Sequence, residues 1–185
     1  MLIAAWTVTA SRKVLQDKWI SVRADDCLTV EGARIAPFYV LEYPDWVQVV
    51  ALDDEDHVLL VEQYRHGLGL TSLELPAGGV EPADAGPLQA AARELLEETG
   101  FTASDWRYIG ALSPNAASHN NRAHIVLALG ARPEQGPEDN PAERMNIIRL
   151  PAAEVIGRVM AGEIVQAMHV ASLAMALTAV GKWAP

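Results

Sequence analysis

Three glutamates, Glu94, Glu97 and Glu98, crowd around one arginine, Arg93, in the segment RELLEE. On a helix, residues three or four positions apart have Cβ atoms about 5–6 Å apart, so these carboxylates would share a small volume and repel one another. A hard divalent cation removes this repulsion, because Mg²⁺ is bound through one or two carboxylates together with waters and substrate phosphates. The spacing therefore indicates a metal site, and a solvated acidic helix end is the alternative that it leaves open.

The segment that carries these residues has the signals of a helix. Pro87 suits the first helical position, where its missing N–H has no intrahelical partner, and Gly100 suits the left-handed residue just past the end. The residues between them are mostly good helix formers. The carboxylates would lie on an arc that faces away from the core. The core side of this helix would consist of Leu88, Ala91, Ala92 and Leu95.

The composition indicates one acidic globular protein. At 185 residues, half of them hydrophobic, the chain can bury one core, and its length favours a single domain. The formal net charge of −10 argues against nucleic acid or an anionic membrane as a partner. The only cysteine, Cys27, excludes an intrachain disulfide and fits a reducing compartment. Because there is no signal-peptide pattern and the apolar stretch near the C-terminus is interrupted by polar residues, we expect a cytoplasmic protein.

Apolar and β-branched runs separated by turn residues predict many strands. An N-terminal antiparallel sheet, with a hairpin turn at Glu31-Gly32, would consist of residues 19–24, 27–30 and 35–41. An acidic turn at 53–56 would join the first two central strands. The central strands would be 46–52, 57–63, 106–112, 124–129 and 147–150. Residues 130–142, rich in Gly, Pro and acidic side chains, are expected to form a mobile loop.

Two helices, at 152–161 and 165–180, would follow the last strand. A mixed sheet flanked by helices gives an α/β sandwich. We expect a single domain over residues 1–185, in which residues 1–43 form the N-terminal strands and residues 44–185 form the core.

The helix and the loop before it resemble the Nudix box, G-x5-E-x7-R-E-U-x-E-E-x-G-U, in which U is an aliphatic or aromatic residue. The residues that match are Gly79, Arg93, Glu94, Leu95, Glu97, Glu98, Gly100 and Phe101. A motif with this many fixed positions is highly specific. The match has one gap, because the first glutamate of the box falls on Ala85, and the neighbouring Asp84 is a partial substitute.

Further residues outside the box resemble the ADP-ribose pyrophosphatase-like branch of the Nudix hydrolases. They are Gln63-Tyr64-Arg65, Glu74-Leu75-Pro76-Ala77-Gly78 and Gly162-Glu163-Ile164. The resemblance implies an α/β/α sandwich and a homodimer in which the N-terminal strands help to complete the site of the partner. It also implies Mg²⁺-dependent hydrolysis, with Mn²⁺ as an alternative. The substrate would be a nucleoside diphosphate sugar such as ADP-ribose, cleaved to a nucleoside monophosphate and a sugar phosphate.

The resemblance also assigns roles to individual residues. Glu94 and Glu98 would be the principal metal ligands, Glu97 would share a second metal, and the carbonyl of Ala77 would add a backbone oxygen. Arg93 would orient the glutamates.

Members of this branch often take the general base from the loop before the last strand. In this chain that loop offers Glu138, Asp139 and Glu143, and we choose Glu143. Its alternative role is that of a solvated loop residue.

Three candidates for substrate binding lie outside the box. Arg65 could hold a phosphate or ribose oxygen, or could instead form a surface ion pair. Trp46 and Tyr64 could stack on the base, although aromatic residues in strands more often lie in the core.

The sequence leaves alternative functions open. The chain could be a Nudix-fold module that binds a nucleotide without hydrolysis, although such a module has no need of three mutually repelling glutamates. It could instead hydrolyse GDP-mannose or another nucleoside diphosphate derivative. A structural role in a complex would rest only on the apolar last helix.

Overall fold

The structure, a computed structural model, describes residues 4–138 and 144–183. The chain divides into two compact units. The first unit consists of residues 1–44 and 113–122, and the second of residues 45–112 and 123–185.

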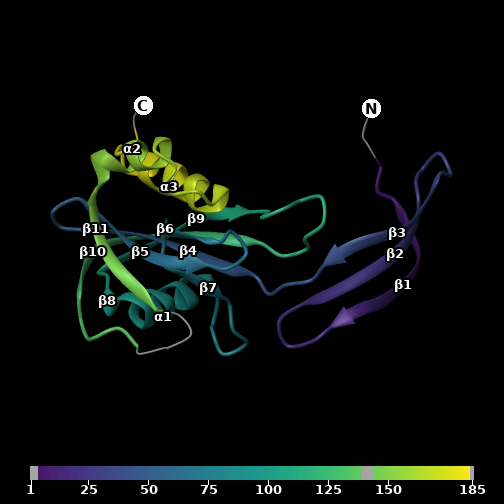
Figure 1. Ribbon diagram of the computed structural model, residues 1–185, viewed down its shortest axis with the longest axis horizontal. Helices are drawn as coiled ribbons and strands as arrows, with labels where there is room; N and C mark the ends of the chain where they lie inside the picture. The colour runs from purple at the N-terminus through teal and green to yellow at the C-terminus, as the bar shows by residue number, and fades with distance from the viewer. Residues whose placement is uncertain (1–3, 139–143, 184–185) are drawn as a thin grey trace. The chain divides into compact units, whose positions relative to one another are not determined.

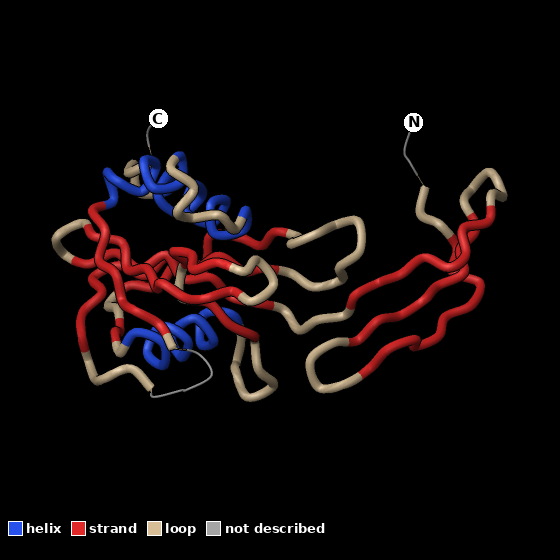
Figure 2. Tube along the Cα trace, in the orientation of Figure 1, coloured by secondary structure: helices blue, strands red, loops and turns tan. Residues whose placement is uncertain are grey.

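The first unit contains a three-stranded antiparallel sheet (Figure 2). In spatial order its strands are β1 (Thr7–Gln16), β2 (Ser21–Leu28) and β3 (Arg34–Leu41). Gly32 lies in the connection between β2 and β3 with a φ of 82°, which confirms the predicted hairpin turn. The loop at 113–122 belongs to the same unit, because Leu41 forms backbone hydrogen bonds with Ser118 (2.7 Å) and Asn120 (3.3 Å).

Two expectations for this sheet were wrong. We did not expect β1, because all ten of its residues are exposed and it lacks the buried face that marks a strand in the sequence. In place of the predicted strands 19–24 and 27–30 there is one continuous strand, β2, over Ser21–Leu28. The acidic pair between them resembles a turn, but Asp25 is buried within the strand. Ser11 Oγ (2.6 Å) and Arg23 Nε (2.9 Å) donate to its carboxylate.

The second unit is built on one mixed sheet of eight strands (Figure 1). The central order is β11-β5-β4-β10-β8, with β6 beside β5, β7 beside β4, and β9 beside β10. β4 and β10 are parallel, and the other pairs are antiparallel. The strands are β4 (Trp46–Asp53), β5 (His57–Arg65), β6 (Leu70–Glu74), β7 (Ala77–Gly79), β8 (Phe101–Thr102), β9 (Asp105–Leu112), β10 (Ala123–Pro133) and β11 (Met145–Pro151).

Helices cover both faces of this sheet, with α1 on one face and α2 and α3 on the other (Figure 1). As predicted, α1 (Pro87–Thr99) begins at Pro87 and ends before the left-handed Gly100, whose N–H donates to Leu96 O at 2.8 Å. The opposite face carries a 3-10 helix, η1 (Ala152–Glu154), followed by α2 (Val155–Met160) and α3 (Ala167–Ala179). The α/β sandwich and the separate N-terminal antiparallel sheet are therefore confirmed. None of the helices in the described residues has the length and hydrophobicity required to cross a membrane.

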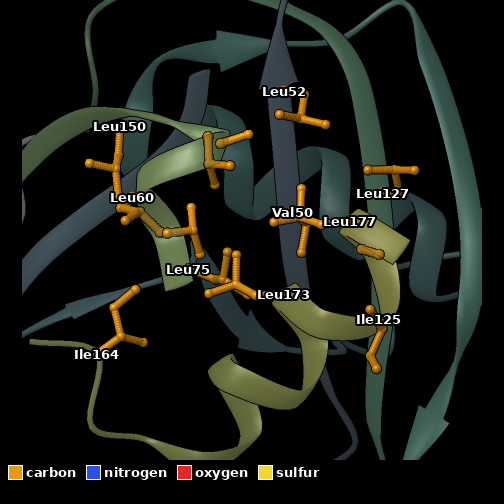
Figure 3. Packing of buried hydrophobic residues seen from close by; sticks show 14 residues of the cluster. Val50, Leu52, Leu60, Leu75, Ile125, Leu127, Leu150, Ile164, Leu173 and Leu177 are labelled. Carbon is orange, nitrogen blue, oxygen red and sulfur yellow. The ribbon is translucent and has the colours of Figure 1, made fainter. Parts of the chain in front are cut away.

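Two apolar clusters hold the helices on the sheet. Fully burying one valine, leucine or isoleucine side chain stabilises a fold by about 1.5–3 kcal/mol. On the α3 side (Figure 3) the cluster includes Val50, Leu60, Leu75, Ile125, Leu127, Leu173 and Leu177. On the α1 side it includes Val47, Val49, Ala91, Leu95, Val126 and Ala128. The two clusters thus hold α1 and α3 against the central strands of the sheet.

Three further expectations needed correction. Strands β6 and β7 lie where we predicted no strand, and β10 extends to Pro133, into the expected loop. On α1, Leu88 is exposed, whereas Glu94 is buried. The carboxylates therefore do not simply face away from the protein, because β7 lies against this side of the helix.

Candidate active site

The buried carboxylate of Glu94 lies directly against the backbone of β7. This strand pairs with β4, and Gly78 is opposite Val47. A Cβ placed on Gly78 would overlap the carboxylate of Glu94. The glycine therefore provides the space that Glu94 occupies between α1 and the sheet.

Arg93 connects the carboxylates of α1 with the backbone of β7. Its Nη1 donates to Glu94 Oε1 (2.8 Å) and to Glu97 Oε2 (3.0 Å), and its Nη2 donates to Gly79 O (2.9 Å). Hydrogen bonds between ionised groups are about twice as strong as neutral ones. These contacts are the ones that the predicted orienting role of Arg93 requires.

Asp84 reaches the same arginine from the loop before α1. Its Oδ2 accepts a hydrogen bond from Arg93 Nη2 (3.0 Å) and its Oδ1 from Arg93 Nε (3.3 Å). These bonds hold the pKa of the Asp84 carboxyl below its usual range and raise the pKa of Arg93. Ala85, where the box has its glutamate, is exposed. The structure therefore brings Asp84, and not the residue at 85, to the arginine of the box.

The pKa of the Glu94 carboxyl lies above its usual range. Burial raises the pKa of this carboxyl, the hydrogen bond and charge of Arg93 lower it in part, and the negative charges of Glu97 and Glu81 add to the rise. A bound cation would relieve this accumulation of negative charge. The predicted repulsion among the carboxylates is therefore present in the folded protein.

Glu98 faces the backbone just before Gly78. Its Oε2 accepts a hydrogen bond from the N–H of Ala77 (3.1 Å), and the carbonyl of the preceding Pro76 accepts one from Val49 N–H (2.9 Å). The Ala77 peptide is thus fixed between α1 and β4. All the predicted ligands are oxygen atoms, which is the set that Mg²⁺ and Mn²⁺ prefer.

The predicted ligands fit such an ion by type, but they do not form a closed cage. Within residues 4–138 and 144–183, no three His, Cys, Asp or Glu side chains lie close enough together to hold a metal ion. Glu94 and Glu97 converge on Arg93, and Glu98 turns to Ala77. The metal-binding role of these side chains stays a prediction.

The predicted general base, Glu143, lies outside the described residues. Glu138 is the last described residue before it, and its N–H donates to Glu97 O at 2.8 Å. The described part of this loop therefore reaches the C-terminal end of α1, where the carboxylates are.

Arg65 binds a buried carboxylate. Its Nε and Nη2 donate to Glu74 Oε1 (2.9 Å) and Oε2 (2.7 Å), and Glu74 is 1% exposed. The ion-pair alternative for Arg65 is thus present, although its partner lies in the interior and not on the surface. The second partner of Glu74 is His169, at the start of α3. Sequence reasoning missed His169, because no local pattern links it to a residue so distant in the chain.

Trp46 and Tyr64 are not core residues. Trp46 is 40% exposed at the start of β4, and Tyr64 is 57% exposed near the end of β5. Trp46 lies next to the site, because it pairs with Gly79 of β7. The Tyr64 hydroxyl lies 3.5 Å from His66 Nδ1. The expectation that strand aromatics are buried is wrong for both residues.

Comparison with known proteins agrees with this geometry. The NUDIX domain model matches residues 43–167, and the model of the nucleoside diphosphate sugar hydrolase N-terminal domain matches residues 6–41. An ADP-ribose pyrophosphatase of Mycobacterium tuberculosis is 35% identical over 166 residues, which are 89% of this chain and 80% of that protein. An ADP-ribose pyrophosphatase of Bacillus subtilis is 30% identical over 119 residues, 64% of this chain and 63% of that protein.

The fold has a close counterpart among solved structures. The crystal structure of an ADP compounds hydrolase matches with a TM-score of 0.86 at 25% identity, and the match covers 99% of this chain and 100% of that chain. The NUDIX match spans well over half of the sequence and contains the whole segment from Gly79 to Phe101. The resemblance drawn from that segment is therefore confirmed, and the chain belongs to the Nudix family of hydrolases.

Proposed function

We propose that this protein hydrolyses the diphosphate bond of a nucleoside diphosphate sugar such as ADP-ribose, with Mg²⁺ as the cofactor and Mn²⁺ as an alternative. The products would be a nucleoside monophosphate and a sugar phosphate. The observation that carries the proposal is the packing of the α1 carboxylates against the backbone of β7, in a chain of the Nudix family. The match to a nucleoside diphosphate sugar hydrolase N-terminal domain and the two ADP-ribose pyrophosphatases support the substrate class.

The chemistry requires positive charge and a base, because a diphosphate repels an attacking water. Mg²⁺ would supply the positive charge against the phosphoryl oxygens. Glu94, Glu98 and the Ala77 carbonyl would hold one ion, and Glu97 would share a second. Arg93 would keep Glu94 and Glu97 in place through the hydrogen bonds described above. Positioning by a packed helix lowers the entropy that the reaction must lose.

The base and the substrate contacts are part of the same proposal. Glu143 would take the proton from the attacking water. Trp46 would stack on the base of the nucleotide, supported by its exposure and its position beside Gly79. Tyr64 would offer a second exposed ring. The half-exposed guanidinium of Arg65, held in place by Glu74, would contact a phosphate or ribose oxygen.

We also propose a cytoplasmic homodimer formed through the first unit. Every residue of β1 is exposed, and a three-stranded sheet buries little apolar surface by itself. A second copy of the chain would cover large apolar side chains of this sheet. They include Trp6, Val8, Val14, Leu15, Leu28 and Tyr39. Sedimentation at micromolar concentration would test the dimer.

The reaction is tested with a panel of substrates in the presence of Mg²⁺, with products separated by chromatography. The panel would contain ADP-ribose, GDP-mannose, UDP-glucose, diadenosine polyphosphates and deoxynucleoside triphosphates. We expect ADP-ribose to be cleaved to AMP and ribose phosphate. Faster cleavage of GDP-mannose would change the assigned sugar, and binding of ADP-ribose without turnover of any compound would favour a nucleotide-binding module.

The metal site is tested by Glu98→Gln. We expect this change to abolish metal-dependent turnover without loss of fold, because glutamine keeps an oxygen for the Ala77 N–H but removes the charge. Glu154→Gln removes the same charge at an exposed position of η1 and should leave activity unchanged. Activity of Glu98→Gln within a few fold of the unmodified protein at saturating Mg²⁺ would reject the ligand assignment.

A further inference from the structure

A buried histidine lies behind the segment Leu75–Ala77, on the α3 side of the sheet. His169 is 1% exposed, and its Nδ1 accepts a hydrogen bond from the N–H of Leu75 at 3.0 Å. Its Nε2 lies 3.2 Å from Glu74 Oε2. Because Nδ1 is an acceptor, the proton of the neutral ring is on Nε2, where it donates to Glu74. Both nitrogens of the imidazole thus have a fixed partner.

The partner on the Nε2 side is itself fixed. Arg65 donates twice to the same carboxylate, and Glu74 is as deeply buried as the histidine. Burial opposes ionisation of Glu74, but the hydrogen bonds from His169 and Arg65 outweigh it and lower the pKa of this carboxyl to about 2. The carboxylate therefore stays ionised at neutral pH, and it keeps the imidazole in one orientation.

The segment Leu75–Ala77 is hydrogen-bonded to three elements, α3, β4 and α1. Leu75 N–H donates to His169 on α3, Pro76 O accepts from Val49 on β4, and Ala77 N–H donates to Glu98 on α1. Pro76, whose ring fixes φ, lies between Leu75 and Ala77, so few backbone torsions can absorb a displacement of Leu75 before it reaches Ala77. The α3 contact therefore acts on the same peptide that faces the carboxylates.

We propose that His169 is a positioning residue of the metal site. Through its bond to Leu75 it holds the Ala77 carbonyl and Glu98 at the distance that a divalent cation requires. This inference rests on the proposed function. His169 touches neither the cation nor the substrate, and its effect passes through the Leu75 N–H. Glu74 and Arg65 maintain the tautomer and the orientation that this bond needs.

The bond to Leu75 and the bond to Glu74 can be separated by substitution. In His169→Asn the side-chain oxygen takes the place of Nδ1 and still accepts from Leu75. In His169→Gln the longer amide reaches the place of Nε2 and still donates to Glu74, but no acceptor remains for Leu75. Ser172→Ala is the matched control, because Ser172 is fully buried one turn further along α3 and donates to Gln48 Oε1 at 2.5 Å.

The measurement is Mn²⁺ binding to the full chain without substrate, followed by electron paramagnetic resonance, with ADP-ribose turnover and the melting temperature recorded alongside. Loss of a residue that orients metal ligands typically costs about 10–100-fold in metal affinity, and we expect this rise in the Mn²⁺ dissociation constant for His169→Gln. His169→Asn should bind Mn²⁺ within a few fold of the unmodified protein. Ser172→Ala should lower the melting temperature and leave Mn²⁺ affinity unchanged.

The outcomes separate this inference from the proposed function. If the unmodified protein binds no Mn²⁺ and cleaves no compound of the panel, both are overturned. If it binds and cleaves, and folded His169→Gln binds Mn²⁺ equally well, only the positioning role is overturned. Mn²⁺ binding by His169→Asn as weak as that of His169→Gln has the same consequence. Should His169→Gln not fold, His169→Met, which fills the space without a good acceptor, takes its place in the comparison.

Discussion

Adding one methyl group at Gly78 tests the central contact of the site. In Gly78→Ala the new Cβ would overlap the carboxylate of Glu94, which has to leave its place. The displaced side chain would lose its 2.8 Å hydrogen bond from Arg93. A hydrogen bond to a charged group contributes about 1.5–3 kcal/mol, and overpacking of a core costs about 1–3 kcal/mol. Both costs arise from the same displacement of Glu94, so they are not added in full. We expect the free energy of unfolding to fall by about 2–3 kcal/mol.

The change would be measured in two ways. For a chain of this size, 1 kcal/mol shifts the melting temperature by about 2–4 °C, so calorimetry should show a fall of roughly 5–10 °C. A misplacement of about 1 Å at a reacting centre can lower the rate about 10²-fold, and we expect kcat/KM for ADP-ribose to fall by about this factor. Gly157→Ala adds the same methyl group on α2, where it would meet no other part of the described structure within 4 Å beyond the neighbouring backbone of its own helix. This variant should lower neither the melting temperature nor kcat/KM.

The two readouts refute different parts of the reasoning. An unchanged melting temperature would show that the Glu94 carboxylate does not lie against Gly78. A lowered melting temperature with full activity would confirm the packing and reject Glu94 as a metal ligand. If Gly157→Ala also lowered both the melting temperature and the activity, the effect of Gly78→Ala could not be assigned to the contact with Glu94.

Three further predictions concern Glu74, Asp84 and Trp46. The pKa of Glu74 is lowered from 4.5 to about 2, so the stability that its carboxylate contributes is fully present above pH 4.5 and is lost as the pH falls toward 2. The loss should total about 3 kcal/mol, and in urea unfolding the free energy of unfolding of Glu74→Gln should depend less on pH across this range than that of the unmodified protein. Asp84→Asn weakens the ion pair with Arg93 and should lower the urea concentration at the midpoint of unfolding. Turnover should fall less than in Glu98→Gln, because Arg93 keeps its bonds to the α1 carboxylates. Trp46→Ala should raise KM for ADP-ribose, because it removes base stacking worth about 1–3 kcal/mol. The melting temperature should stay nearly unchanged, since the ring is 40% exposed. An unchanged KM would remove Trp46 from the binding site.

The sequence was sufficient for the parts of the fold that depend on local signals. Pro87 and Gly100 bound α1 as expected, because the missing N–H of proline and the left-handed conformation of glycine act within one turn of helix. The hairpin at Gly32 and the acidic turn after β4 follow from the same kind of local chemistry. The family was also recognisable, because the box places its fixed residues within one short segment.

The parts that were missed depend on contacts between distant segments. Helical spacing placed Glu94 on the solvent side, and the burial of its carboxylate became visible only when β7 was packed against α1. β1 has no buried face, and its apolar residues do not alternate over the whole strand. The bond from Leu75 to His169 joins residues 94 positions apart, and no spacing rule connects them.

The arrangement of charge around Arg93 explains why the proposed site would favour a bound cation. Arg93 is hydrogen-bonded to the carboxylates of Asp84, Glu94 and Glu97, so its one positive charge is shared among three negative ones. Burial, together with the negative charges of Glu97 and Glu81, raises the pKa of the Glu94 carboxyl by more than Arg93 lowers it. Protonation of Glu94 would remove one of the proposed ligands, whereas a divalent cation at the proposed site would reduce the repulsion and keep every carboxylate oxygen available. The proposed metal site therefore predicts that added Mn²⁺ raises the melting temperature of the unmodified protein more than that of Glu98→Gln.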